Sequence, residues 1–488
     1  MANMNAVSDE ILSRIQKSTA GVLTSTGIAG LDLSDLISLV PVNSPFRDSL
    51  ARTTPPQGAQ YAQWEALTNV NNTQPNPFTA FDYAGPLVNV NKMQVGAAFA
   101  KVSAGYTVTK DAITRAGGYA DAKAVAIFNA INQFKIGEDK SALGGQNFAL
   151  TTPATPTVTQ SDTGGSIAAS TAVNVKITAR TGANFYWGGS TIPSSQGTVT
   201  TSTVTAATHS ATATWAAIPG AVAYDVWVAG FYYTTVTVNT VIITSVPVAN
   251  ATSVPNIPNL YATAPTVLPT ADSSAGANQF NGILATLAGD YANPGSLGLV
   301  TRGTGVSSGA YFQSLDGAPL TISGTNIVEL DELNQQVYDN VQLSPDAYMV
   351  SSQESVSITK ALLGSTASTT FFDPSDGTAR VNAVLGASVT HYVNKITGTN
   401  IRIELMPNQA PGTIIARRDT IPFPNSNITN TCEFRTQEDL TDWEYAAGRV
   451  ANTAGGGPRF DGEVYSTEAF VNRAPVAMAV LQSVAPSA

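Results

Sequence analysis

The sequence predicts an α+β protein that carries an all-β domain as an insertion. A helical apolar period runs through residues 119–143, and the charge content then falls abruptly after Leu150. From Thr151 to Pro265 the only charged residues are Asp162, Lys176, Arg180 and Asp225. Mixed helical and strand-like patterns return after this segment. The change in composition at both ends indicates a separate unit within a larger host.

Composition narrows the class of protein. Only 12% of the residues are charged, the formal net charge is -10 and the pI is about 4.7. An acidic chain does not neutralise phosphates with a basic face, so sequence-specific nucleic-acid binding is disfavoured. A low charge content is typical of a surface covered by copies of the same chain. The single cysteine, Cys432, excludes an intramolecular disulfide and is expected to be a small buried hydrophobe.

The first 56 residues predict a short helix and an extended arm. Val7, Ile11 and Ile15 recur every four residues, and prolines are frequent between Gly27 and Pro56. Neither a signal-peptide core nor a membrane-spanning stretch is present in the sequence, so we expect synthesis and assembly in the cytoplasm.

Residues 57–105 predict a long two-stranded excursion with Asn- and Pro-rich bends. Aromatic and Val residues are spaced here by polar ones: Tyr61, Trp64, Phe78, Phe81, Tyr83, Val88, Val90 and Val95. Because an isolated two-stranded ribbon is marginal in water, we expect it to rest on its own domain or on a neighbouring subunit.

The most regular helical pattern runs from Tyr119 to Leu143 and stops at Gly144-Gly145. The residues expected on one face are Ala124, Ile127, Phe128, Ile131 and Phe134. At 1.5 Å per residue such a helix is about 37 Å long, enough to cross a domain.

The segment Thr151–Pro265 predicts an antiparallel β-sandwich with strands near 173–177, 211–215, 224–228 and 236–243. Ala213-Thr214-Trp215, Pro219-Gly220-Ala221 and Tyr224-Asp225-Val226-Trp227-Val228 together resemble the immunoglobulin-like and fibronectin type III pattern. Pro-Thr links at both ends predict an independently folding module set apart by stiff connectors. Its aromatic residues Trp187, Tyr232 and Tyr233 either stack on sugars or serve packing.

Beyond the insertion, the patterns predict a helix through Ile327, Leu330, Leu333 and Val337, a strand at 347–350, a helix at 352–363, and strands at 384–393 and 401–406. No catalytic, cofactor-binding or metal-binding residues are predicted. His209 and His391 supply too little for a triad or metal site. The Arg302–Gly309 and Asp373–Gly377 segments are interpreted as turns, and Glu329, Asp331 and Glu332 as acidic residues at a helix start.

This order of elements resembles the Hong Kong 97-type major capsid protein of tailed bacteriophages. The resemblance rests on the helix, the proline-rich arm, the β excursion, the long helix, the α/β region and the closing Gly462–Tyr465 and Ala469–Ala477 segments. It divides the chain into an N-terminal arm (1–56), an extended loop (57–105), a peripheral domain with a spine helix (106–150), the inserted sandwich (151–265), an axial domain (266–411) and a return to the peripheral domain (412–488). Some family members cross-link a lysine to an asparagine, and Lys92 is the candidate lysine here, although neither the asparagine nor the assisting acid can be matched.

The resemblance implies a structural protein and not an enzyme. Many copies, as hexamers and pentamers, would form the icosahedral shell of a virion that encloses double-stranded DNA without reading its sequence. Portal, scaffolding and decoration proteins are further candidate partners, and no membrane is expected. Two alternatives remain: a tail-tube or β-rich surface adhesin protein, which would lack the long helix, and a carbohydrate-active enzyme with an appended sandwich, which would need paired cleft carboxylates.

Overall fold

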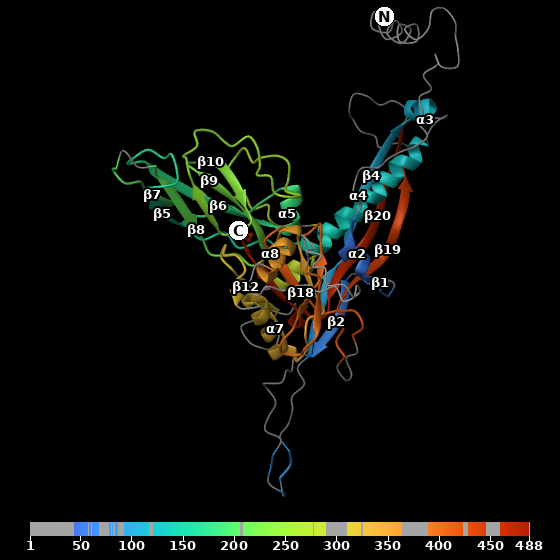
Figure 1. Cartoon of the computed structure of the whole chain (residues 1–488). Helices are drawn as coiled ribbons and strands as arrows, with labels where there is room; N and C mark the ends of the chain where they lie inside the picture. The colour runs from blue at the N-terminus through green and yellow to red at the C-terminus, as the bar shows by residue number, and fades with distance from the viewer. Residues whose placement is uncertain are drawn as a thin grey trace, which may run out of the picture.

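The computed structural model describes residues 43–487 except 57, 60, 68–77, 80, 82, 86–91, 117–120, 205–207, 277, 289–309, 324–325, 364–388, 423–427 and 446–458. Three parts are seen in Figure 1: an elongated sheet with a long helix, a β-sandwich, and a six-stranded sheet with helices. The helix predicted near Val7, most of the predicted arm, and the Arg302–Gly309 and Asp373–Gly377 segments lie outside the described residues.

The elongated part is a four-stranded sheet covered on one face by α4. The strands, in spatial order, are β1 (Ala51–Thr53), β19 (Cys432–Glu444), β20 (Arg459–Asn472) and β4 (Ala100–Thr109), and α4 spans Ala122–Gly144. Asp121 caps the helix by accepting hydrogen bonds from the backbone amides of Lys123 and Ala124 at 3.0 and 3.2 Å. The predicted long helix is therefore confirmed. A short helix, α3 (Lys110–Ala116), joins β4 to α4 at the far end of this part (Figure 1).

The described end of the predicted arm is packed rather than extended. Residues Pro45–Ser49 form α2, and β1 then pairs in parallel with β19. Phe46 is fully buried, with its ring centroid 6.0 Å from that of Phe470. The expectation of an unpacked arm up to Pro56 is wrong for this stretch, because Phe46 supplies an apolar anchor between the prolines.

Two antiparallel strands, β2 (Tyr61–Leu67) and β3 (Lys92–Ala98), form a ribbon in register from Tyr61 opposite Ala98 to Leu67 opposite Lys92. This confirms the predicted two-stranded excursion. The base of the ribbon packs Ala62 against Ala469 and Val471 of β20.

The segment after Leu150 forms two packed antiparallel sheets. One has the order β10-β9-β6-β7 and the other β11-β8-β5. Their bounds are β5 (Thr157–Ser161), β6 (Ala172–Thr181), β7 (Gly197–Thr200), β8 (Ser210–Thr214), β9 (Ala221–Val228), β10 (Phe231–Val236) and β11 (Thr240–Ile243). Apolar residues from both sheets, such as Val175, Ala213, Val226 and Ile243, share one core. The predicted strand 236–243 is two strands, because the chain turns between Val236 and Thr240.

A buried polar network fastens the outer face of this sandwich to the returning chain. Asp225 is fully buried and accepts hydrogen bonds from Arg180 at 2.8 Å, Thr235 at 2.6 Å and Tyr261 at 3.0 Å. The Arg180 guanidinium also lies 3.9 Å from the centre of the Tyr261 ring. Tyr232 is fully buried, and its hydroxyl shares a hydrogen bond with the Thr235 hydroxyl at 2.7 Å. Two of the four charged residues of the insertion, Arg180 and Asp225, are thus paired with each other inside this network.

The third part is a six-stranded mixed sheet of order β12-β21-β18-β15-β17-β16 with helices packed on it. The strands are β12 (Tyr311–Ser314), β15 (Ala347–Val350), β16 (His391–Val393), β17 (Asn400–Leu405), β18 (Ile414–Arg417) and β21 (Ala479–Gln482). Remaining elements are α6 (Ile283–Ala288), β13 (Ile322–Ser323), β14 (Asn326–Ile327), α7 (Val328–Val341), α8 (Ser352–Leu363) and a 3-10 turn at Pro475–Ala477. The closing apolar run through Leu481 thus joins this sheet and not the elongated one, because it pairs with β18 and β12.

The three parts share a core, so the sandwich is not set apart. Leu143 of α4, Phe185 of α5 (Gly182–Trp187) and Val222 of β9 pack in one cluster with residues of the other two sheets. Gly144 and Gly182 touch so closely that a Cβ on Gly144 would lie 2.6 Å from the Gly182 Cα. The ends of the insertion do lie side by side, since the Leu150 amide donates to Ser274 Oγ at 3.0 Å. The expectation of a module set apart from its host is therefore wrong, while its independent folding stays a prediction.

Candidate assembly surfaces

The single cysteine and the two histidines of the chain occupy structural positions. Cys432 is buried, and this burial raises the pKa of its thiol to about 12. His209 is buried with Nε2 2.9 Å from the Val204 carbonyl, whereas His391 is exposed on β16. Among the described residues no three His, Cys, Asp or Glu side chains gather as metal ligands, and no described helix is long and apolar enough to cross a membrane.

The carboxylates at the start of α7 are held by separate partners. Glu329 accepts from the Thr321 amide at 2.9 and 3.0 Å, Asp331 accepts from the Tyr392 hydroxyl at 2.6 Å, and Glu332 accepts from Gln313 at 2.8 Å. The Asp331 carboxylate and burial raise the pKa of Tyr392, with burial the larger cause. This arrangement fits the interpretation of acidic residues in a first helical turn.

The first exposed surface is the end of the ribbon. Phe78, Phe81 and Tyr83 lie between β2 and β3 and are 88%, 109% and 77% exposed. The Thr79 hydroxyl donates to the Tyr83 carbonyl at 3.1 Å, which closes a turn among them. Figure 1 shows this stretch, in blue, well beyond the body of the molecule. Three large aromatic rings are thus presented to solvent at the end of a projection.

The second exposed surface is the distal half of β19. Val464 of β20 is buried toward α4, and alternation along paired strands places Trp443 and Tyr465 on the opposite face of the sheet. Trp443 is 56% exposed, and Leu440, in an irregular stretch of the pairing, is 37% exposed. Lys101 of β4 lies 4.7 Å from the Tyr465 ring centre and 2.5 Å from Glu463. β19 was not predicted from the sequence, because Leu440 and Trp443 lie three residues apart and break the alternation expected of a strand.

The outward side of α4 forms a third exposed surface. Of the residues predicted on one apolar face, Phe134 is buried, but Phe128 is 55% exposed and Ala124 is exposed. The face that packs on the sheet uses Ala130, with Ala126, Ile127 and Ile131 partly buried beside it. Phe128 points elsewhere because residues two apart on a helix lie on nearly opposite sides, and Ala130 is on the buried side.

A buried cluster of ion pairs holds residues 47–52, where the described chain enters the elongated part, against α4. Glu138 of α4 is fully buried and accepts from Arg47 Nε at 2.6 Å and from Arg52. Arg52 also lies 3.1 Å from Glu468 of β20, whose pKa is raised by burial. Asp139 accepts from the Arg47 backbone amide at 2.7 Å and from Asn408 at 2.8 Å, and burial raises its pKa. These contacts orient the chain as it enters the elongated part.

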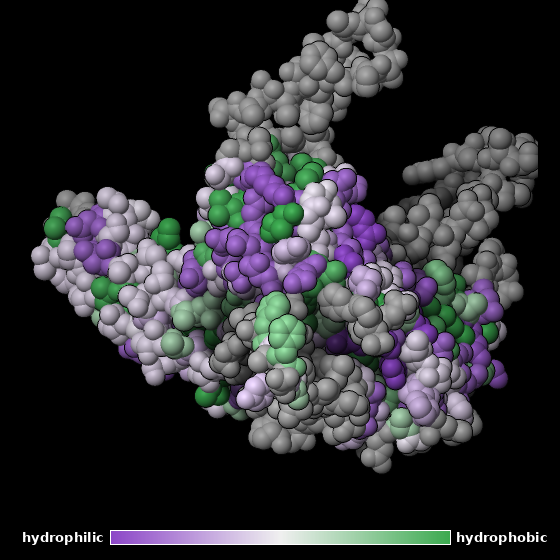
Figure 2. Space-filling view, turned by 90° about the horizontal axis from the view of Figure 1, so that it is seen from below, coloured by the Kyte–Doolittle hydropathy of each residue, from purple (hydrophilic) through white to green (hydrophobic). Residues whose placement is uncertain are grey.

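The residues expected to contact molecules outside the chain differ in their exposure. Tyr232 is buried, which agrees with the packing alternative, and Tyr233 is half-buried with its hydroxyl 3.3 Å from Thr244 Oγ1. Trp187 is 52% exposed. Lys92 begins β3 opposite Leu67. Figure 2 shows the sandwich, at the left, as a mostly pale surface, while strongly hydrophilic residues concentrate on the rest of the molecule.

The chain was compared with known proteins. No protein-family model matches it, and no curated protein is similar. Among solved structures, it is similar to a chain of the cyanophage A-1(L) capsid asymmetric unit, with TM-score 0.48 and 9% identity over 94% of this chain and 98% of that one. It is also similar to the capsid of the native GTA particle (TM-score 0.43, 6% identity, 94% and 97% covered) and to the SrpI encapsulin complex of Synechococcus elongatus PCC 7942 (TM-score 0.38, 9% identity, 93% of each chain).

Proposed function

We propose that this chain is the major capsid protein of a tailed bacteriophage, with a Hong Kong 97-like capsid fold and an immunoglobulin-like insertion. Its copies form hexamers and pentamers that close into an icosahedral shell around double-stranded DNA in the virion. The protein acts by assembly and not by catalysis. The arm, extended loop, peripheral and axial domains keep the residue ranges expected from the sequence, with β18 and β21 of the last segment contributing to the axial sheet.

The observation that carries the proposal is the ribbon of β2 and β3. Its base is anchored by a small apolar cluster, while its end presents Phe78, Phe81 and Tyr83 almost fully to solvent. A two-stranded ribbon is marginal in water, and exposed apolar groups of this size mark interaction sites. A neighbouring copy supplies the missing surface in a shell, so each ribbon is stabilised by the subunit next to it.

The elongated sheet supports the same account. It exposes Trp443 and Leu440 on the face opposite α4, and β4 forms one edge among the described strands. An edge strand and an apolar sheet face are both suited to contact with another chain. The presence of α4, with 23 residues, argues against the all-β tail-tube or adhesin alternative.

Other partners follow from a shell function. The net charge of -10 fits a container that holds DNA without grasping its phosphates tightly. Portal, scaffolding and decoration proteins would meet the shell, which is assembled in the bacterial cytoplasm. The sandwich faces outward in this proposal, and Trp187 is the aromatic residue that it offers to a host-surface glycan.

The ribbon end allows a direct test. We expect the triple variant Phe78→Ser, Phe81→Ser, Tyr83→Ser to remain folded but to accumulate as subunits or small oligomers in light scattering and negative-stain images. The matched control changes three exposed apolar residues of the sandwich, Ile242→Ser, Val248→Ser and Val267→Ser, which are 62%, 91% and 73% exposed. The control should form closed particles as the unaltered chain does. Closed particles from the ribbon variant would refute the proposed role of the ribbon.

A further inference from the structure

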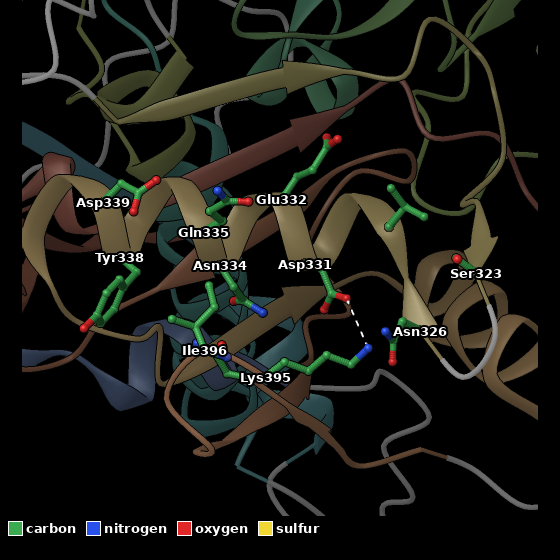
Figure 3. Close-up of a pocket in the computed structure, with 12 residues that line it drawn as sticks. Ser323, Asn326, Asp331, Glu332, Asn334, Gln335, Tyr338, Asp339, Lys395 and Ile396 are labelled. Atoms are coloured by element: carbon green, nitrogen blue, oxygen red, sulfur yellow. Dashed lines mark hydrogen bonds and ion pairs between the residues drawn. The ribbon is translucent and has the colours of Figure 1, made fainter.

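A pocket of about 500 Å³ opens beside α7, and no part of the assembly argument above uses it. It is lined by α7 and by the turn that joins β16 to β17 (Figure 3). The helix carries two rows of polar side chains in this view, one on each side. Glu332 and Asp339 belong to one row, whereas Asp331 and Asn334 belong to the other and face the Lys395–Ile396 segment. Only the second row lies between the helix and the turn.

Asn334 is held with an unused donor. It is 1% exposed, and its Oδ1 accepts a hydrogen bond from the Tyr348 hydroxyl at 2.7 Å. This bond fixes the orientation of the amide, and its Nδ2 has no hydrogen-bond partner among the described residues. Figure 3 shows this side chain between α7 and the Lys395–Ile396 segment. A buried amide donor that lacks an acceptor costs free energy, so a group that brings an acceptor to it is stabilised there.

Asp331, one helical turn before Asn334, is held with an unused acceptor. Its Oδ1 accepts from the Tyr392 hydroxyl at 2.6 Å, while Lys395 Nζ lies 3.9 Å from Oδ2, too far for a hydrogen bond (dashed in Figure 3). Residues three apart on a helix are neighbours on one face. The rings of Tyr348 and Tyr392 meet edge to face with centroids 6.1 Å apart, so one tyrosine pair orients both side chains.

The result is a fixed pair of hydrogen-bonding atoms, the donor Nδ2 of Asn334 and the acceptor Oδ2 of Asp331. The Lys395 ammonium adds a second donor beside them. A hydroxyl both donates and accepts, so two adjacent hydroxyls can satisfy all three groups. An anion would meet the carboxylates of the lining, and a simple cation offers no acceptor to Asn334. Tyr338 and Ile396 add apolar surface that a sugar ring can cover.

We propose that the pocket binds a neutral sugar through two adjacent hydroxyl groups. One hydroxyl donates to Asp331 Oδ2 and accepts from Lys395 Nζ, and the neighbouring oxygen accepts from Asn334 Nδ2. Binding requires only the folded chain and does not depend on shell assembly. With few direct hydrogen bonds to one sugar unit, we expect a dissociation constant of about 1–10 mM.

Saturation-transfer difference NMR of the full chain detects ligands of this affinity. Glucose, galactose and mannose serve as probes because together they present adjacent hydroxyls in trans and in cis arrangements. We expect at least one of them to bind. The variant Asp331→Asn keeps the shape of the side chain but replaces the acceptor Oδ2 with a donor, so it should weaken binding about tenfold or more. The matched control Asp339→Asn makes the same chemical change in the other row and should bind as the unaltered chain does.

The variant Lys395→Met gives a second measurement, since this side chain is 55% exposed and its replacement should leave the fold intact. Loss of its donor should weaken binding several-fold. Binding of none of the three sugars, or binding that neither Asp331→Asn nor Lys395→Met changes, would overturn the inference. Displacement of the sugar by equimolar acetamide would also overturn it, because an amide would then be the preferred occupant. Weaker binding by Trp187→Ala alone would place the sugar on the sandwich, with the same consequence.

Discussion

Glu138 of α4 is fully buried, and Arg47 Nε donates a hydrogen bond to its carboxylate over 2.6 Å. Residues 91 positions apart are thereby joined at the centre of the elongated part. Arg52 also contacts this carboxylate and lies 3.1 Å from Glu468, so two arginines share two buried carboxylates. Glu138 is fully buried and both arginines are largely buried, so loss of this carboxylate would leave positive charge in a poorly hydrated site.

Replacing Glu138 with Gln should lower the free energy of unfolding by about 3 kcal/mol, because two arginines lose their buried counter-charge. Urea unfolding of the unassembled chain measures this change. The variant Glu438→Gln removes an exposed carboxylate and should shift stability by less than about 0.5 kcal/mol. Equal effects of the two substitutions would contradict the structural role assigned to Glu138.

Two glycines of α4 make a matched pair for testing the junction with the sandwich. A Cβ on Gly144 would lie 2.6 Å from the Gly182 Cα, whereas a Cβ on Gly137 meets nothing within 4 Å. We expect Gly144→Ala to destabilise the chain by about 1–3 kcal/mol through overpacking. Gly137→Ala should instead stabilise it by up to about 1 kcal/mol, since alanine favours the helix. Thermal unfolding of both variants would reveal the opposite signs, and a stabilising Gly144→Ala would show that sandwich and helix are not in contact.

Glu354, at the start of α8, gives a pH dependence of defined sign. It is fully buried, and this burial raises the pKa of its carboxyl above the ordinary 4.5, although the Gly412 amide donates to it at 2.6 Å. The protonated form is favoured in the folded chain, so the contribution to stability is present below pH 4.5 and is lost as the pH rises through the raised pKa.

Glutamine cannot gain this contribution, so the unaltered chain should become more stable relative to Glu354→Gln as the solution is acidified from neutral pH toward about 4.5. Urea unfolding of the two proteins at matched pH values measures the difference. A difference that stays constant, or that moves in favour of the glutamine variant on acidification, would contradict this account of the carboxyl.

The elements predicted correctly from the sequence are those in which apolar residues recur in a regular pattern. The strand at 347–350 and the helix at 352–363 have the bounds of β15 and α8, and Leu330, Leu333 and Val337 form the buried face of α7. The two helices pack one face on the sheet, and β15 is buried on both faces, so in each case the local apolar pattern reflects the environment of the segment.

Tertiary contacts account for the failures. Phe128 is exposed because the face of α4 that meets the sheet is centred near Ala130, and the helical period alone does not tell which part of a broad apolar stripe is buried. Tyr232 is buried because the chain near Tyr261 returns over the outer face of the sandwich, which no local pattern indicates. A pocket lined by α7 and by the turn that joins β16 to β17 could not be predicted from the sequence either. Lys395, which lines it, lies 64 residues beyond Asp331 in the sequence.

The most direct test of the central claim is electron microscopy of the purified full chain at high concentration. The account predicts closed shells of uniform diameter, with density for the sandwich on the outer surface in averaged images. Open tubes, or a chain that remains monomeric under every condition in which it is soluble, would contradict a capsid function.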